Sequence, residues 1–315
     1  MKIKLIILLI LALLCSAFFL FYGINYKFFA FSMNLRVPKL LAMILSAYCI
    51  GAASLIFQTI IKNTIVTPCL LGMNAMYLLI HTSVVFFLGS TSIIATNKYI
   101  SFCVDLVIMG IMATFIYSYF FRISKYNVLY VLLAGTVLAT LFSSLQNSLT
   151  RIMDPNEYDA LLSTLVASFN LVNADILALA GVLTIILSII YYKDLALLDV
   201  LSLGKEQSIN LGIDYNKSIK RLLLGVTLFI AIATALVGPI SFLGLIIANL
   251  SRQLFKTYKH TYLISGSVLF GVLLLVFSQS MVERVFNLSV PISVFISIVG
   301  GIYFMYLLYA NKGKL

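Results

Sequence analysis

The sequence contains few residues whose types and spacing could support catalysis or metal binding. The two histidines, His81 and His260, lie far apart, and the four cysteines form no Cys-x-x-Cys pair, so no zinc or haem site is indicated. A Gly-x-x-x-x-Gly-Lys-Ser/Thr loop is absent, because Gly204-Lys205 lacks the upstream glycine, and nucleotide binding by that route is excluded. We therefore expect no catalytic residue, no metal and no cofactor, and the class of intramembrane enzymes is disfavoured.

Two polar residues fall inside long apolar segments, and they are the candidates for intramembrane chemistry. Asp105 is a carboxylate in such a segment and His81 is an imidazole in another. An ionisable residue within a membrane is by default a candidate for a transport pathway. A secondary transporter driven by an ion gradient would carry several such groups in mid-span. That class remains an alternative with one weak candidate, Asp105.

The composition places the chain in a membrane. Of its 315 residues, 62% are hydrophobic and 10% charged, whereas a soluble domain has roughly 25% charged residues. Continuous apolar runs exclude a porin-type barrel, and four scattered cysteines exclude a disulfide scaffold. The net charge of +11 indicates membrane orientation and not nucleic-acid binding. The sequence predicts an all-α polytopic membrane protein.

Ten apolar segments are long enough, or nearly so, to cross a hydrocarbon core of roughly 30 Å as helices. They lie near Leu5–Tyr22, Leu40–Ile61, Cys69–Leu88, Tyr99–Phe121, Val128–Leu145, Asp175–Tyr192, Leu222–Val237, Ile240–Phe255, Tyr262–Val282 and Val290–Ala310. The seventh and eighth are short and meet at Gly238-Pro239, so they could form one broken helix. Basic clusters on both sides of this pair favour two crossings, because both clusters belong on the same side.

The distribution of charge predicts the orientation. With the N-terminus inside, the inner segments hold 15 of the 21 Lys and Arg residues, and the remainder are Lys27, Arg36, Lys39, Lys98, Arg151 and Arg284. This bias favours cytoplasmic placement of both termini. Residues 1–315 then form one transmembrane domain. Its halves, about 1–172 and 173–315, contain five spans each, and an odd number of spans makes duplicated halves an inverted repeat.

The long outer segment between the fifth and sixth spans has an amphipathic pattern. Leu161, Leu162, Leu165, Val166 and Phe169 fall on one helical face, and Ser163, Thr164, Ser168 and Asn170 lie largely on the other. A short helix that is half apolar and half hydroxyl-rich suits the rim of a water-filled path. The alternative is a helix lying on lipid headgroups, which the absence of Lys and Arg from 152 to 192 weakens.

Four motifs occur in order along the chain. The first runs from Arg36-Val-Pro38-Lys39 through Gln58 and Asn63 to Thr67-Pro68 and Leu71-Gly72; the second pairs Leu203-Gly204 with Leu211-Gly212; the third is Gly238-Pro239-Ile240-Ser241-Phe242-Leu243-Gly244-Leu245 followed by Arg252; the fourth joins Pro291 to Gly300-Gly301. Together they resemble the permease family of ATP-driven importers for iron-siderophores, haem and cobalamin. Thr64, Lys39 and Ala248-Asn249 depart from the family pattern.

This resemblance implies a fold like that of the cobalamin-importer permease, and a role in import across the bacterial plasma membrane. It implies a cytoplasmic ATPase dimer and a substrate-binding lipoprotein as partners. The variant Gln58 to Gly72 motif, together with the segment 163–170, resembles a branch that supplies one of two different permeases for catecholate-type siderophores. A ferric siderophore is therefore the expected cargo and a heterodimer the expected assembly. A homodimer that imports haem or cobalamin is the alternative.

The resemblance also suggests roles for particular residues. Arg36, Lys39 and Arg284, at the outer helix ends, are expected to dock the binding protein. Gln58 and Asn63 join the outer polar residues Ser163, Thr164, Ser168 and Asn170 as candidates for the pathway and its gate. The inner loop 194–220 is expected to form two short helices with a sharp turn at Gly204 and to contact the ATPase, through Leu203, Gly204, Lys205, Glu206, Ser208, Leu211 and Gly212.

Overall fold

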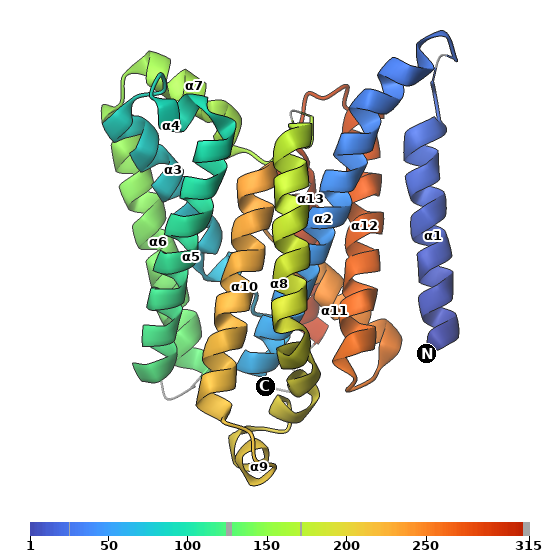
Figure 1. The fold of residues 1–315 in the computed structure, drawn as a ribbon, viewed down its shortest axis with the longest axis vertical. Helices are drawn as coiled ribbons and strands as arrows, with labels where there is room; N and C mark the ends of the chain where they lie inside the picture. Colours follow the sequence, from blue (N-terminus) through green and yellow to red (C-terminus); the bar gives the residue numbers. More distant parts are fainter. Residues whose placement is uncertain (25, 124–127, 171, 311–315) are drawn as a thin grey trace.

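The computed structural model describes residues 1–24, 26–123, 128–170 and 172–310, and its long helices run along one common axis (Figure 1). The elements are α1 (Lys2–Phe21), η1 (Tyr26–Phe28), α2 (Phe29–Ile61), η2 (Cys69–Met73), α3 (Asn74–Leu88), α4 (Ile93–Thr96), α5 (Lys98–Ile123), α6 (Val128–Ile152), α7 (Pro155–Leu165), α8 (Ala174–Leu201), α9 (Lys205–Asn210), α10 (Tyr215–Val237), α11 (Leu243–Phe255), α12 (His260–Arg284) and α13 (Ile292–Ala310).

Helices that could cross a membrane make up most of the chain. Within the described residues, seven helical segments are long and apolar enough to do so, and α11 and the apolar part of α13 are shorter. Helix α6 covers the fifth predicted span. The prediction of an all-helical polytopic membrane protein is confirmed.

Helices α2 and α10 lie at the centre of the bundle, and most of their side chains are buried. Helix α2 packs against α10 and α12, and α10 also packs against α5 and α8. Small residues allow the close contact of α2 with α12, because a Cβ atom added at Gly271 would lie 2.9 Å from the Cβ of Ala47. Small residues at helix interfaces let membrane helices approach closely.

Helix α2 begins at Phe29, eleven residues before the predicted span. Pro38 is inside the helix, nine residues after Phe29. Proline has no backbone N–H, so the helix loses one hydrogen bond, the one to the carbonyl four residues earlier. Neighbouring helices allow such interruptions in membrane bundles. The early start carries α2 out to the η1 turn at the outer end of the molecule (Figure 1).

The pair α10 and α11 consists of two helices joined at Gly238-Pro239 and is not one broken helix, while α11, with 13 residues, is shorter than a full span. Gly238 has φ +90° and Phe242 has φ +60°, and these two residues bracket the non-helical segment between the helices. Lys4 Nζ donates to the carbonyl of Leu254, which places the end of α11 beside the start of α1. Both ends of the pair therefore lie at the α9 end of the molecule (Figure 1).

The predicted inner loop 194–220 is shorter than expected. Helix α8 continues past Tyr192 to Leu201, so the first of the two expected short helices is the last part of α8. The second is α9, and the turn between them contains Gly204 with φ +114°. We call the segment from Ser202 to Asp214, which includes α9, the elbow. Residues 195–201, which are apolar apart from Asp199, continue the pattern of the preceding span and contain no glycine or proline that would end a helix.

The predicted helix at 161–170 is also corrected. Helix α7 starts at Pro155 after Asp154, whose side chain caps it, and it ends at Leu165, where Val166 is extended. The N–H of Ser168 then bonds to the carbonyl of Val237 at 2.9 Å. Phe169 therefore does not share a helical face with Leu161. The chain leaves the helix because the end of α10 supplies a hydrogen-bond acceptor.

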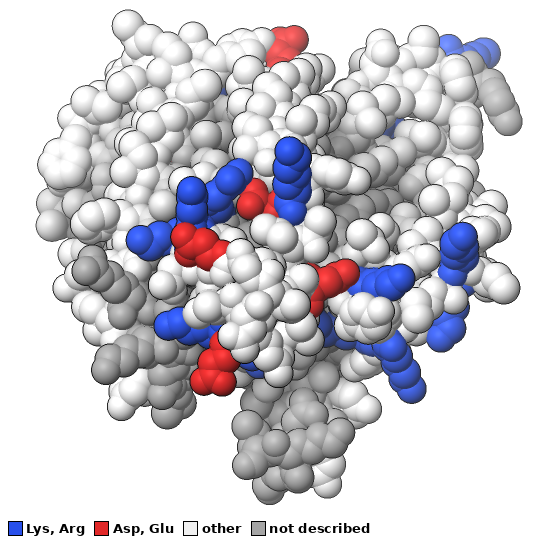
Figure 2. Space-filling view, turned by 60° about the horizontal axis from the view of Figure 1, so that its bottom comes forward, with Lys and Arg blue, Asp and Glu red and all other residues white. Residues whose placement is uncertain are grey.

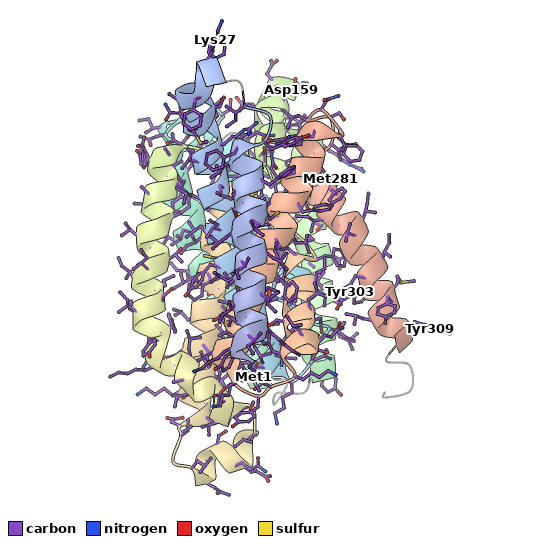
Figure 3. The ribbon with its side chains drawn as sticks, turned by 90° about the vertical axis from the view of Figure 1, so that its right-hand side faces the viewer. Met1, Lys27, Asp159, Met281, Tyr303 and Tyr309 are labelled. Carbon is purple, nitrogen blue, oxygen red and sulfur yellow. The ribbon has the colours of Figure 1, made fainter. Side chains whose placement is uncertain are left out.

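The two ends of the molecule differ in what they carry. In Figure 3, Met1 and Tyr309 lie toward the end that carries the elbow, whereas Lys27 and Asp159 lie at the opposite end. Figure 2 shows the elbow end, with Lys and Arg side chains distributed across the face and Asp and Glu side chains among them. Following the orientation that the basic residues predict, we call the elbow end the inner end and the opposite end the outer end.

Candidate functional sites

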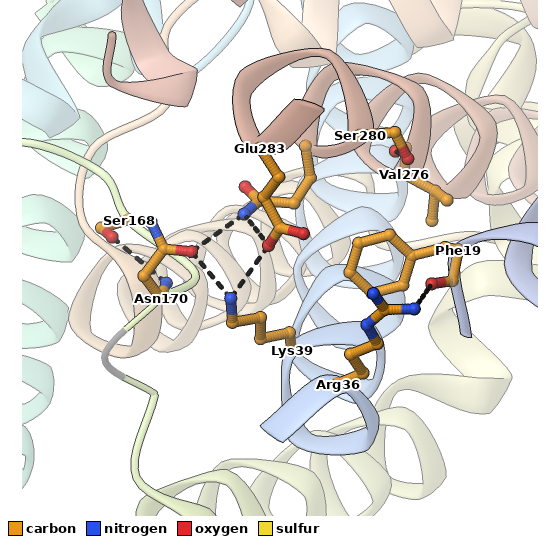
Figure 4. Close-up of polar contacts among 9 residues, drawn as sticks. Phe19, Arg36, Lys39, Ser168, Asn170, Val276, Ser280 and Glu283 are labelled. Carbon is orange, nitrogen blue, oxygen red and sulfur yellow. Dashed lines mark hydrogen bonds and ion pairs between the residues drawn. The ribbon is translucent and has the colours of Figure 1, made fainter. Parts of the chain in front are cut away.

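A cluster of four polar side chains lies at the outer end, where α2, the segment after α7 and α12 meet (Figure 4). Lys39 Nζ lies 2.9 Å from Glu283 Oε1 and 3.0 Å from Asn170 Oδ1. Gln279 Nε2 donates to the same two oxygens, at 2.8 Å and 3.0 Å. The Lys39 and Glu283 side chains are 17% and 18% exposed, so the ion pair is only partly screened by water. The structure thus joins Lys39, expected to dock a partner, to Asn170, expected on the path.

Arg36 and Arg284 hold the end of α1. Arg36 Nη1 donates to the carbonyls of Phe19, Leu20 and Tyr22 at 2.9–3.1 Å. Arg284 Nη2 donates to Tyr22 O at 3.0 Å, and its guanidinium lies 4.4 Å from the centre of the Tyr22 ring. The last carbonyls of a helix lack intrahelical donors, and a cation there interacts favourably with the helix dipole. The two arginines thus have intramolecular roles, and docking by them stays a prediction.

Ser168 lies on a cavity between α3, α5 and α10. The cavity has a volume of about 270 Å³, and its lining also includes His81, Asp105 and Gly238. His81 Nδ1 lies 3.1 Å from Asp105 Oδ2, and both side chains are buried. Ser163 and Thr164 lie on α7, but their side chains are outside the described residues. Membership of Ser168 in a transport path stays a prediction.

Gln58 and Asn63 shape the loop between α2 and η2. Gln58 is 1% exposed and its Nε2 donates to Thr64 O at 2.7 Å. Asn249 Nδ2, from α11, donates to the same carbonyl at 2.8 Å. Asn63 Oδ1 accepts the N–H of Ile65 at 2.8 Å, which closes a turn of the kind that asparagine favours. Asn249 was not among the predicted site residues. The sequence signal that could have identified it is the departure of Ala248-Asn249 from the family pattern.

Two interruptions of the helices meet inside the bundle. The first contains Gly72 with φ +98°, and the second is the segment between α10 and α11. Asn74 Nδ2, beside the first, donates to Ser241 Oγ, in the second, at 3.2 Å. Among the described side chains, Asn74 Oδ1 and Thr67 Oγ1 are buried without a hydrogen-bond partner. Irregular backbone within a membrane is tolerated where it lines a cavity, and paired interruptions are typical of transporter binding sites.

The elbow presents an apolar surface at the inner end. Leu203, Ile209 and Leu211 are 53%, 51% and 62% exposed, and Lys205 and Glu206 are exposed beside them. Single exposed apolar residues are common, but a group of them on a projecting element marks a contact surface. Gly212 has φ +80° and ends the short helix.

Ser208 requires a correction within this set, because it is not on the elbow surface. It is completely buried, and its Oγ donates to the carbonyls of Gly204 and Val200, at 2.6 Å and 3.1 Å. It therefore holds α9 against the end of α8. Since every third or fourth residue of a helix points the same way, the packing of α9 decides which of its residues are buried. That packing was not visible in the sequence pattern.

The chain matches known proteins along nearly its whole length. The model of the FecCD transport family matches residues 4–310. The chain is 40% identical over 307 residues to the petrobactin import system permease protein YclO of Bacillus subtilis (strain 168), covering 98% of this chain and 97% of that protein. It is 32% identical over 270 residues to the petrobactin import system permease protein FatC of Bacillus anthracis, covering 86% and 76%.

Two solved structures share its fold. A metal-chelate type ABC transporter in an inward-facing conformation superposes with a TM-score of 0.80 at 23% identity, covering 98% of this chain and 99% of that chain. PsaBC from Streptococcus pneumoniae, in complex with Fab, superposes with a TM-score of 0.59 at 15% identity, covering 90% and 95%. At these identities the structures establish the common architecture.

Proposed function

Because the chain belongs to the FecCD transport family, we propose that it is the permease subunit of an ATP-driven importer of ferric siderophores. The observation that carries the cargo class is its 40% identity to a petrobactin import permease across 98% of the chain. Permeases of such importers are not enzymes, and the nucleotide is hydrolysed by a separate subunit. The interrupted helices that meet through Asn74 and Ser241 support a path through the bundle.

The two ends of the molecule are assigned to different partners. A cytoplasmic ATPase dimer binds the elbow, where Leu203, Ile209 and Leu211 are exposed. A substrate-binding lipoprotein binds the outer end, near Lys39 and Glu283. A second, different permease completes the translocation path as a heterodimer. The importer lies in the bacterial plasma membrane with both termini in the cytoplasm, which agrees with the basic residues at the elbow end.

The halves 1–172 and 173–315 are proposed to be an inverted repeat. Helices α2 and α10 are the second spans of the two halves and pack against each other. The third span of the first half consists of η2 and α3, and it is interrupted by non-helical backbone at Gly72. The third span of the second half is α11, and it is preceded by Phe242, which also has a positive φ. Equivalent interruptions in both halves are the pattern expected of a transporter built from two repeats.

Transport by iron-starved cells tests the proposal. A strain that lacks this permease should fail to take up iron as ferric petrobactin, and the intact gene should restore uptake. Haem and cobalamin are the matched alternative cargoes, and uptake of either, without uptake of a ferric siderophore, would contradict the cargo class. The isolated chain in nanodiscs should show no ATP hydrolysis above background. Robust hydrolysis by the isolated chain would contradict the assignment as a permease subunit.

A further inference from the structure

A chain of hydrogen bonds begins at the loop between α2 and η2 and leads into the bundle. Its first link is the Thr64 carbonyl, which accepts from Gln58 and Asn249 as described above. Gln58 Oε1 in turn accepts from Arg252 Nε of α11 at 3.3 Å. The Gln58 amide therefore has both of its ends engaged, one with the loop and one with α11. An amide held at both ends has little rotational freedom, so the position of the loop depends on Arg252.

Arg252 connects this link to the next one. Its Nη2 donates to Thr59 Oγ1 at 3.2 Å, so a single planar guanidinium spans two neighbouring residues of α2. Lysine could not make both contacts with one geometry, because its ammonium is a point charge on a flexible stem. Arg252 and Thr59 thus tie α11 to the inner end of α2.

His260 extends the series of hydrogen bonds from Thr59 to α8. Its Nε2 lies 2.9 Å from Thr59 Oγ1, and its Nδ1 lies 2.6 Å from Asp199 Oδ1. The backbone N–H of His260 donates to the same carboxylate oxygen at 2.8 Å, so Asp199 also caps the start of α12. A carboxylate at a helix N-terminus satisfies a free donor and interacts favourably with the dipole. Asp199 is in the last turn of α8, five residues before Gly204.

We propose that these seven residues form an inner relay that makes the α2–η2 loop and the elbow move together. Its members are Thr64, Gln58, Asn249, Arg252, Thr59, His260 and Asp199. Arg252, Thr59 and His260 are positioning residues, since they act by connecting the loop to the end of α8. The proposal rests on the proposed function, in which an ATPase binds the elbow, and on the prediction that Gln58 and Asn63 belong to the transport path.

Two features of the region allow such a movement. A cavity of about 370 Å³ lies beside the relay, and its lining includes Ser202 of the elbow and Asn63 and Thr64 of the loop. The Thr59 hydroxyl lies 2.9 Å from both Leu55 O and His260 Nε2. Its single hydrogen serves one of them at a time, so Thr59 can release His260 and still bond within α2.

The decisive experiment uses the complete importer in proteoliposomes and measures cargo imported per ATP hydrolysed. His260→Ala removes two links of the relay and Arg252→Lys removes one, and in both variants we expect ATP hydrolysis to continue while this ratio falls about fivefold or more. Asp199→Asn keeps an oxygen acceptor and should remain near the wild-type ratio, whereas Asp199→Ala should behave like His260→Ala. Tyr48→Phe is the matched control, because Tyr48 bonds to Ser188 at 2.7 Å and also ties α2 to α8, outside the relay.

A distance measurement separates coupling from simple loss of stability. Thr64 and Gln207 have exposed side chains, so spin labels at Thr64→Cys and Gln207→Cys, with the native cysteines replaced by alanine, report on the loop and the elbow. The distance between the labels should stay constant when ATP binds to the wild-type importer and should change in His260→Ala. Equal behaviour of the two proteins, with an unchanged import ratio, would overturn the relay. Failure of the wild-type importer to transport any ferric siderophore would instead overturn the proposed function.

Discussion

Three basic residues at the outer end, Arg36, Lys39 and Arg284, have distinct physical roles despite their common charge. Lys39 neutralises Glu283 within a polar cluster. Arg36 and Arg284 instead complete the hydrogen bonding of the α1 terminus. A guanidinium suits this second task because several of its N–H groups point in fixed directions. At the residue scale, the same side chains can stabilise the fold and offer charge to a partner.

Replacing Arg36 with alanine should loosen the end of α1 and leave the rest of the bundle folded. Three carbonyls lose a charged donor, and a hydrogen bond to a charged group contributes about 1.5–3 kcal/mol. Hydrogen exchange in nanodiscs should therefore become faster at residues 20–24. Arg151→Ala is the matched control, because Arg151 is an exposed arginine of α6. Unchanged exchange in Arg36→Ala would show that these contacts do not hold α1.

Docking by Arg36 and Arg284 can be separated from their structural role. Changing both to lysine keeps the charge and weakens the contacts to α1, whereas changing both to glutamate reverses the charge. Each exposed ion pair contributes only about 0–1 kcal/mol, so the glutamate pair should weaken binding-protein affinity about tenfold and the lysine pair less. Affinity should be measured at low and high salt, since screening reduces the difference. Wild-type affinity in the glutamate pair would place docking elsewhere.

At the scale of elements, the elbow depends on one glycine with two constraints. Gly204 has φ +114°, and a Cβ atom there would lie 2.7 Å from Lys62 Nζ. Helix α8 can therefore end and α9 can begin within a short turn. This turn lies close to Lys62, at the end of α2. A side chain at this position would strain the backbone, which is the main cost, because the Lys62 ammonium ends a flexible side chain and can move aside.

A series of glycine substitutions should separate these constraints. Gly204→Ala must adopt φ +114° and ψ 174°, a combination that essentially only glycine adopts, Gly212→Ala must adopt φ +80°, and Gly181→Ala, within α8, has neither a positive φ nor a close contact. We expect thermal stability to fall most in Gly204→Ala and less in Gly212→Ala. In Gly181→Ala the free energy of unfolding should rise by about 0.5–1 kcal/mol, because alanine favours a helix more than glycine does. Equal melting temperatures for the first and third variants would contradict this account of the elbow.

For the whole molecule, the positions of the chain ends and the elbow define its orientation in the membrane. Met1, Tyr309 and the elbow lie toward one end, and Lys27 and Asp159 lie at the other (Figures 1 and 3). A chain that returns to its starting side crosses the membrane an even number of times. The excess of basic residues at the elbow end predicts that this end faces the cytoplasm.

Cysteine labelling in intact cells should establish this orientation. A membrane-impermeant maleimide should label Asp159→Cys from outside and should label Gln207→Cys only after the membrane is opened. Both side chains are exposed, so access depends on the side of the membrane alone. The native cysteines must be replaced first, because Cys103 is also exposed. The opposite labelling pattern would reverse the proposed orientation and move the ATPase contact away from the elbow.

The sequence by itself determined the class of the molecule. The length of the apolar runs is a local property, and it sufficed to predict the helical bundle and the presence of two helices on either side of Gly238-Pro239. The turn at Gly204 was also predictable, because glycine adopts positive φ readily. The four motifs could be recognised from their residue types, spacing and order along the chain, which was enough to indicate the family.

Only the tertiary structure decided where helices end and which side chains pair. Helix α7 stops at Leu165 because the chain beyond it bonds to Val237, and Ser208 is buried because α9 folds back onto α8. The partners of Arg36, Gln58 and His260 lie between 6 and 201 residues away along the chain, and Asp199 meets His260 only after α8 and α12 have packed. Sequence periodicity describes one helix at a time, whereas these contacts require the relative positions of several helices.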